Sequence, residues 1–143
     1  MENDSRQTFT KAERLCSKKT IDRLFSGGNK SLAAYPVRAV YMLAEPGAQT
    51  HVSVLISVSK RHFKRAVKRN RVKRQIREAY RKNKHILYDA LGGGTEGMGR
   101  TLVVAFIWLS DDLFETAQVE TKVRNLLYRM AETLVAAPGE VEA

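Results

Sequence analysis

Cysteine and histidine are scarce in this chain of 143 residues, which has one Cys and three His. A single cysteine, Cys16, cannot form an internal disulfide bond and excludes a zinc site built on several cysteine ligands. The histidines His51, His62 and His85 show no metal-ligand spacing with one another or with Cys16. This cysteine usage is typical of a protein from a reducing compartment.

Long hydrophobic runs are also missing. The longest apolar segment, residues 102–109, has eight residues, whereas a helix that crosses a bilayer needs about 20. The N-terminal sequence MENDSRQTFT is polar and has no hydrophobic signal-peptide core. We therefore expect a cytoplasmic protein that has no membrane partner.

The motifs of enzyme catalysis are absent as well, including G-x-S-x-G and H-E-x-x-H. Asp111 and Asp112 form the nearest approach to a carboxylate pair, but helix capping explains them better, since Asp112 and Glu115 have the spacing of a capping box. The glycine-rich loop at residues 91–99 lacks the lysine of a phosphate-binding loop. No catalytic residues and no metal ligands are expected in this chain.

Acidic residues are in the minority, because 15 Asp and Glu stand against 25 Lys and Arg, for a formal net charge of +10. Residues 60–84, KRHFKRAVKRNRVKRQIREAYRKNK, hold 13 of the cations and a single acid, Glu78. A charge run can be no more than a solvated helix face. Self-repulsion among so many cations instead favours a polyanionic partner, and nucleic acid is an abundant one.

The length and the hydrophobic pattern predict one domain at residues 11–135, between flexible tails at residues 1–10 and 136–143. The basic segment suggests that this is an RNA-binding domain. The expected order is a helix from about Lys18 to Gly27-Gly28, strands at 35–43 and 51–58, a long basic helix, a buried strand at 101–109, and a helix at about 116–135. The turn between the first two strands predicts an antiparallel hairpin. The fold class is α+β, an α/β sandwich whose small, mostly antiparallel sheet of three to four strands is covered by helices.

Helical periodicity divides the basic segment into two sides. The apolar side is expected to face the core and consists of Val72, Ile76, Ala79, Tyr80 and Leu87. The displayed side consists of Asn70, Arg74, Arg77 and Arg81. Phe63 and Val67 lie on the displayed side, so the start of the segment must pack differently or form a separate loop or short helix.

Two surfaces could bind RNA. On the basic helix, arginine forks suit phosphate oxygens, and Asn70 is either a recognition amide or an ordinary polar helix residue. The second surface is the sheet face beside the first helix, where Tyr35, Tyr41 and Phe25 could stack on bases. The periodicity favours the alternative that Tyr41 and Phe25 are core residues.

The run SVSKRHFKRAVKRNRVKRQIREAYR closely resembles the signature of the protein subunits of bacterial ribonuclease P, in which an RNR helix follows a strand ending in a V-S-K type segment. The matching residues are Val58, Ser59, Lys60, Arg69, Asn70, Arg71, Lys73, Arg74, Arg77 and Glu78. The opening ERLCSKKTIDRLFSGG is similar to the first helix of the family, and TLVVAFIWL occupies the place of its buried strand. The resemblance covers about residues 12–135.

The resemblance implies that the protein is the non-catalytic subunit of a ribozyme endonuclease. It would bind the catalytic RNA, one protein to one RNA, and assist removal of the 5′ leader from precursor tRNA, with Mg²⁺ held mainly by the RNA. The implied fold is an α/β sandwich with a left-handed βαβ crossover, similar to a domain of ribosomal proteins. A general basic RNA-binding or ribosome-associated protein is the alternative, and a protein-only nuclease that uses Asp111 or Asp112 is a third hypothesis.

By position, the resemblance also implies which residues bind. The RNA subunit would be contacted by Lys60, Arg61, Arg65, Lys68, Arg69, Asn70, Arg71, Lys73, Arg74 and Arg77. A cleft between the first helix and the sheet would hold the single-stranded leader and be lined by Ile21, Phe25, Val37, Ala39 and Tyr41. Many family members have aromatic residues at the positions of Ile21 and Val37, so stacking on the leader is expected to be weaker here.

Overall fold

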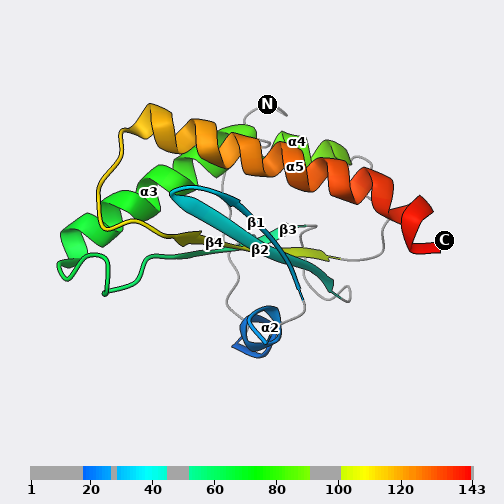
Figure 1. Cartoon of the computed structure of the whole chain (residues 1–143), viewed down its shortest axis with the longest axis horizontal. Coiled ribbons are helices and arrows are strands. Elements are labelled where there is room, and N and C mark those ends of the chain that lie inside the picture. The colour runs from blue at the N-terminus through cyan, green and yellow to red at the C-terminus, as the bar shows by residue number, and fades with distance from the viewer. Residues whose placement is uncertain (1–17, 27–28, 45–51, 91–100, 143) are drawn as a thin grey trace, which may run out of the picture.

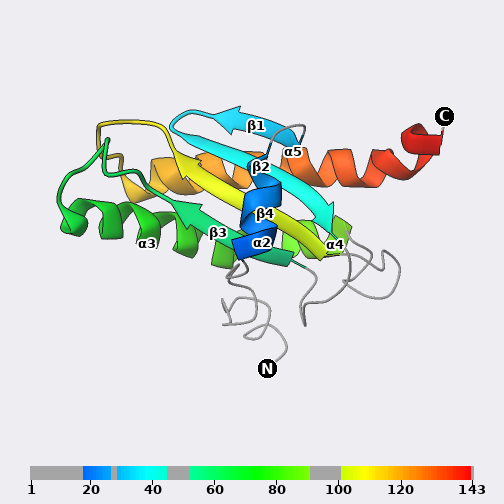
Figure 2. The same ribbon diagram turned by 90° about the horizontal axis from the view of Figure 1, so that it is seen from below.

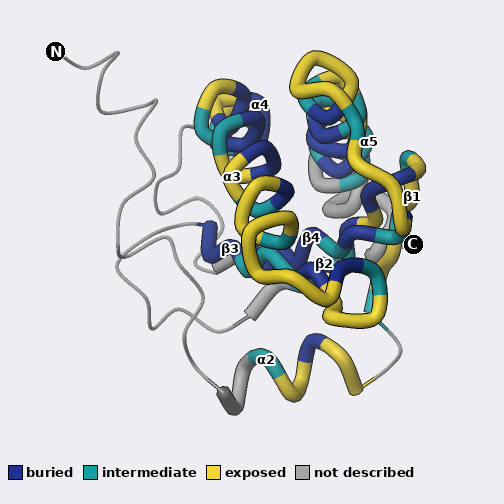
Figure 3. The backbone as a smooth tube through the Cα atoms, turned by 90° about the vertical axis from the view of Figure 1, so that its left-hand side faces the viewer, coloured by how far each residue is buried: buried dark blue, intermediate teal, exposed yellow. Residues whose placement is uncertain are grey.

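A four-stranded sheet with helices on both faces forms the part of the chain that the computed structural model describes, residues 18–26, 29–44, 52–90 and 101–142 (Figure 1). The elements are α2 (Lys18–Leu24), β1 (Lys30–Ala34), β2 (Val37–Ala44), β3 (Val52–Ser57), α3 (Ala66–Asn83), α4 (His85–Ala90), β4 (Thr101–Trp108) and α5 (Thr116–Glu142). Helices α3, α4 and α5 cover one face, and α2 lies on the other (Figure 3). The predicted α+β class is confirmed.

The strand order is β1-β2-β4-β3, with β4 antiparallel to β2 and parallel to β3. The predicted hairpin of β2 and β3 is therefore wrong, because β4 lies between them. Residues 102–106 of β4 are buried in unbroken sequence, with side chains on both faces. A strand that is apolar on both faces is stable in the interior of a covered sheet, which accounts for its central place.

Strand β1 was not predicted. Its sequence, KSLAA, has only half-buried or exposed side chains and so gives little hydrophobic signal. It pairs with β2 in antiparallel register through a turn at Tyr35 and Pro36, and these two strands form the true hairpin. Pro36 thus stands in the turn, where its missing N–H disturbs no strand pairing.

The connection from β3 through α3 and α4 to β4 joins two parallel strands. In Figure 2 both strands run toward the left, β4 lies above β3, and the helices lie behind the sheet. This arrangement is a left-handed crossover, as the resemblance implied, although such connections are right-handed in nearly all proteins.

The main core lies between the sheet and the layer of α3, α4 and α5. The predicted apolar side of α3 is confirmed, since Val72, Ile76, Ala79 and Tyr80 are buried in it. Helix α5 adds an apolar stripe of Val119, Val123, Leu126, Leu127 and Met130. It continues to Glu142, beyond its expected end near residue 135.

The capping box of helix α5 lies three residues later in the sequence than predicted. The backbone N–H of Glu115, the residue before the helix, donates to Gln118 Oε1 at 3.0 Å, which is the return bond of a capping box shifted from 112/115 to 115/118. Asp112 instead donates its backbone N–H to Ser110 Oγ at 2.9 Å. Asp111 and Asp112 therefore precede the helix without capping it.

Helix α2 packs on the other face of the sheet through Leu24, which is buried against Val103 and Ala105. Asn29 Nδ2 donates to the carbonyls of Arg23 and Leu24 at 3.0 and 2.7 Å and so caps the end of the helix. The expected Gly27-Gly28 cap lies outside the described residues. In the described part of the chain, none of the helices has the length and apolar character to span a membrane.

Candidate nucleic-acid interface

Helix α3 presents most of its cations on the side that faces away from the core. It contains eight Lys or Arg residues and one acid, Glu78. The exposed polar residues are Lys68, Asn70, Arg71, Arg74, Arg77 and Lys82, and Lys73 is half-buried. Figure 3 shows buried and exposed stretches alternating within each turn of α3. A basic surface therefore stands on a helix that is fixed by its apolar side.

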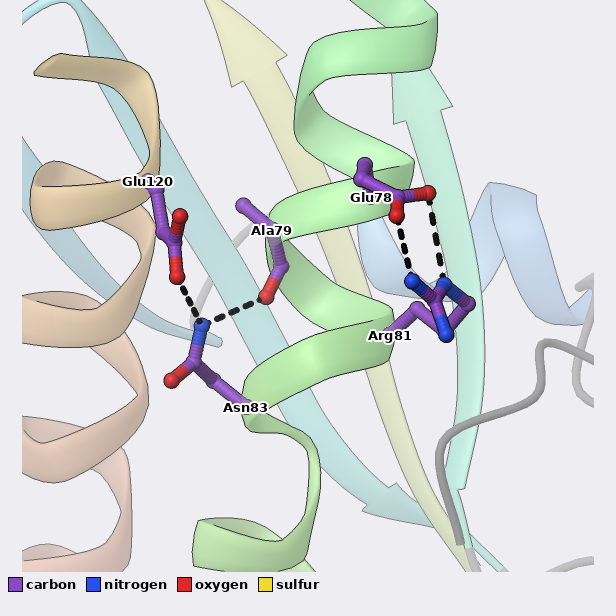
Figure 4. A network of polar contacts seen from close by, with 5 residues as sticks. All are labelled: Glu78, Ala79, Arg81, Asn83 and Glu120. Carbon is purple, nitrogen blue, oxygen red and sulfur yellow. Dashed lines mark hydrogen bonds and ion pairs between the residues drawn. The ribbon is translucent and has the colours of Figure 1, made fainter. Parts of the chain in front are cut away.

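The predicted displayed side of α3 loses one member, Arg81, to an ion pair. Arg81 Nε donates to Glu78 Oε1 at 3.3 Å, and Arg81 Nη2 contacts Glu78 Oε2 as well (Figure 4). The hydrogen bond from Arg81, aided by the charges of Arg81 and Lys82, lowers the pKa of the Glu78 carboxyl below its usual value. Arg81 thus binds Glu78, the acid of α3. Asn70, Arg74 and Arg77 remain as the exposed members of the displayed side.

Two polar residues on the buried side of α3 fix the helix against the start of α5. Gln75 Nε2 donates to Phe114 O at 3.0 Å and to Thr116 Oγ1 at 3.1 Å. Asn83 Nδ2 donates to Ala79 O at 2.8 Å and to Glu120 Oε2 at 3.3 Å (Figure 4). Sequence reasoning missed both, although Asn83 continues the buried spacing of 72, 76 and 79. These bonds set the direction in which the basic side points.

A separate loop precedes α3, which is one of the alternatives that the sequence left open. Ser59 O accepts the backbone N–H groups of His62 and Phe63 at 3.1 and 3.4 Å, which closes a turn, and Phe63 is anchored in the core with 5% of its surface exposed. The loop displays four exposed cations: Lys60, Arg61, Lys64 and Arg65. The basic surface of α3 therefore continues into the loop.

Arg69 differs from the other predicted RNA contacts, because its guanidinium is engaged within the protein. Its Nη1 donates to the carbonyls of Phe63 and Lys64 at 2.9 and 2.8 Å. The residue is half-buried, while Lys68 and Asn70 beside it are exposed.

The predicted leader cleft needs a correction at the sheet. Val37, Ala39 and Tyr41 are buried in the main core, on the face of β2 opposite α2. They share that face with Trp108, Phe106 and Val104, their register partners on β4. The reason is that side chains alternate along a strand, and the core takes the odd-numbered set. These three side chains do not line a surface beside α2.

The side chains of β2 on the α2 side are Arg38, Val40 and Met42. Arg38 is exposed, whereas Val40 and Met42 are half-buried against the small cluster around Leu24. Ile21 of α2 is half-buried, and Phe25, directly after the helix, is 46% exposed. We name these five residues, Ile21, Phe25, Arg38, Val40 and Met42, the α2 surface.

The aromatic candidates divide accordingly. Tyr41 is a core residue, and Phe25 is accessible on the α2 surface. Tyr35 is 58% exposed in the β1–β2 turn, where its ring meets Phe114 edge-on at 6.3 Å between centroids.

Comparisons with known proteins agree with one another. The family model described as Ribonuclease P matches residues 9–131. The ribonuclease P protein component of Porphyromonas gingivalis is 42% identical over 123 residues, which are 86% of each chain. That of Chlorobaculum tepidum is 32% identical over 115 residues, 77% of this chain and 74% of the relative.

Solved structures show the same fold. The RNase P protein of Thermotoga maritima has a TM-score of 0.62 at 21% identity and covers 82% of this chain and 96% of its own. A Staphylococcus aureus RNase P protein structure also has a TM-score of 0.62 at 21% identity, covering 87% and 99%. The sequence match, the fold and the basic helix lead to one conclusion: the chain belongs to the ribonuclease P protein family, whose members are subunits of RNase P and have an RNA partner.

Proposed function

We propose that this chain is the non-catalytic subunit of a bacterial RNase P, and that it binds the catalytic RNA and the 5′ leader of precursor tRNA. The observation that carries the proposal is the one-sided exposure of cations along α3 and the preceding loop, on a helix whose other side is buried. In this role the protein assists endonucleolytic removal of the leader in the cytoplasm.

The basic surface would dock on the catalytic RNA. Arginine forks at 71, 74 and 77 can each meet two phosphate oxygens, and lysines add mobile charge. Phosphate contacts release counterions, so about six to eight of them give a slope of roughly −4 to −7 for log K against log salt. Asn70, exposed between cations, can bond sugar or backbone groups that a charge alone would not distinguish.

The leader would lie on the α2 surface. Phe25 offers an accessible ring on which a base can stack, and Arg38 on the neighbouring strand offers a cation for the phosphates. Val40 and Met42 would add apolar contact rather than stacking. The helices α2 and α3 lie on opposite faces of the sheet (Figure 1). The leader and the catalytic RNA would therefore not compete for one surface.

The chemistry would belong to the RNA. The catalytic Mg²⁺ would be held mainly by the RNA subunit. Among the described residues, no three His, Cys, Asp or Glu side chains gather where they could hold a metal ion. The chain then contributes positive charge and positioning, with one protein per catalytic RNA.

Cleavage of precursor tRNA by the RNase P RNA of the same organism, with and without the protein at physiological Mg²⁺, tests this function. The protein should raise the rate or the substrate affinity, and cleavage should be absent with protein alone. An unrelated folded RNA serves as the control for affinity. Equal affinity for that RNA, together with no effect on cleavage, would support a general RNA-binding protein instead.

A further inference from the structure

The guanidinium of Arg69 is bound to the loop that precedes its own helix. Nη1 donates to Phe63 O at 2.9 Å and to Lys64 O at 2.8 Å, six and five positions back in the chain. The side chain therefore folds back over the first turn of α3 and holds the two carbonyls that lead into the helix.

The first turn of α3 is an unfavourable place for a cation that has no carbonyl partners. The first turn of α3 has no acidic residue, and Arg65 at its N-cap makes no side-chain capping bond. The N-terminus of a helix carries partial positive charge, and Lys64, Arg65 and Lys68 add to it. Two carbonyl acceptors offset this repulsion, so the contact has a physical cause beyond chance proximity.

The loop needs a fixing contact of this kind. It displays Lys60, Arg61, Lys64 and Arg65, and residues 59–65 include no acid that could offset their mutual repulsion. Its other anchors include the turn at Ser59, the buried ring of Phe63 and the contact of His62 Nδ1 with Asp111 Oδ1 at 2.6 Å. The carbonyls bound by Arg69 are those of Phe63 and of the next residue, where the chain enters the helix.

We propose that Arg69 is a positioning residue that orders the loop at residues 59–65, so that its four cations meet the RNA as a preformed surface, and that Arg69 is not itself a main phosphate contact. The effect on RNA affinity rests on the proposed RNA binding, whereas the ordering of the loop by Arg69 applies to the free protein. An ordered loop spares the entropy of ordering it on binding.

The test uses Arg69→Lys, which keeps the charge but replaces the planar fork with a compact ammonium on a flexible stem. Arg71→Lys is the matched control, being the same change at an exposed position of the same helix. Amide hydrogen exchange of the free protein is measured at His62 and Phe63, whose N–H groups close the loop turn. Exchange should be about tenfold faster in Arg69→Lys, unchanged in Arg71→Lys, and unchanged in β4 of both, which shows that the fold is intact.

Binding to the RNase P RNA is then measured over a salt series. Arg69→Lys should weaken binding about tenfold with an unchanged salt slope, since no phosphate contact is lost. Arg71→Ala should reduce the slope by about 0.7 to 0.9. Unchanged exchange at His62 and Phe63 in Arg69→Lys would overturn the positioning role, whatever the affinity. If instead no variant affects RNA binding while the exchange result holds, the proposed RNA surface fails and the positioning role stands.

Discussion

His62 and Asp111 are 49 positions apart in the sequence, and their side chains meet with His62 Nδ1 2.6 Å from Asp111 Oδ1. The contact ties the loop before α3 to the segment that follows β4. Asp111 therefore has a structural partner at the base of the basic surface. This partner also argues against the hypothesis that Asp111 serves a protein-only nuclease.

Asp111→Ala should loosen the loop, with Asp112→Ala as the control at the next exposed acid. The loss in free energy of unfolding should be small, about 0 to 1 kcal/mol, because the Asp111 carboxylate is exposed. Faster amide exchange at residues 62–63 in Asp111→Ala alone, measured by NMR, is the expected result. Equal effects of both substitutions would mean that charge near the loop matters and the pairing does not.

The double charge reversal Arg74→Glu with Arg77→Glu should weaken binding to the catalytic RNA and lower the salt slope by at least about 1.4 to 1.8, since two phosphate contacts are removed. Its thermal unfolding should stay close to that of the parent, because both side chains are exposed. Lys30→Glu on β1 is the control for a change in net charge alone. If Lys30→Glu lowers the salt slope as much, per reversed charge, as the double variant does, then α3 is not the docking surface.

Phe25→Ala should leave assembly with the catalytic RNA intact and reduce the preference for substrates that carry a leader. Loss of one stacked base costs about 1 to 3 kcal/mol, which corresponds to a change of about five- to 150-fold in affinity. Phe25→Leu, which retains apolar contact but no ring, separates stacking from packing. The measurement is the ratio of affinities for precursor and mature tRNA, and an unchanged ratio in both variants would place the leader elsewhere.

Ile76→Ala should destabilise the protein by about 2 to 5 kcal/mol, because the side chain is fully buried beneath α3. Val67→Ala is the control on the same helix, since Val67 is 76% exposed and should change stability by less than about 0.5 kcal/mol. Urea denaturation measures both. Similar losses would show that α3 packs on a different side from the one described.

The periodicity of α3 was enough to separate its buried side from its displayed side, because Ile76 and Tyr80 recur at helical spacing among cations. The face of β2 was harder to assign. Both alternating sets are partly apolar, Val37 and Tyr41 on one side and Val40 and Met42 on the other, and only the covering helices decide which set becomes core. The strand residues predicted for the leader cleft, Val37, Ala39 and Tyr41, therefore face the core instead.

Two further features depend on tertiary structure. Strand β4 lies between β2 and β3 because helices cover both faces of the sheet. The turn between β2 and β3 predicts a hairpin and gives no sign of a strand between them. The bonds of Arg69 go to backbone carbonyls, and these leave no mark on side-chain spacing. A motif match therefore assigned Arg69 to RNA contact, whereas its geometry indicates support of the loop.

The central position of β4 has a consequence for the order in which the protein can form. Its residues, 101–108, leave the ribosome after those of β1, β2 and β3, yet both β2 and β3 need β4 as a neighbour. Until then the nascent chain can form the β1–β2 hairpin and helix α3, but two strands keep open edges and the basic helix has no completed sheet beneath it. Distant pairing of this kind slows folding and prolongs exposure of unpaired strands. The same strand that completes the core therefore sets the moment at which the basic surface of α3 becomes rigid.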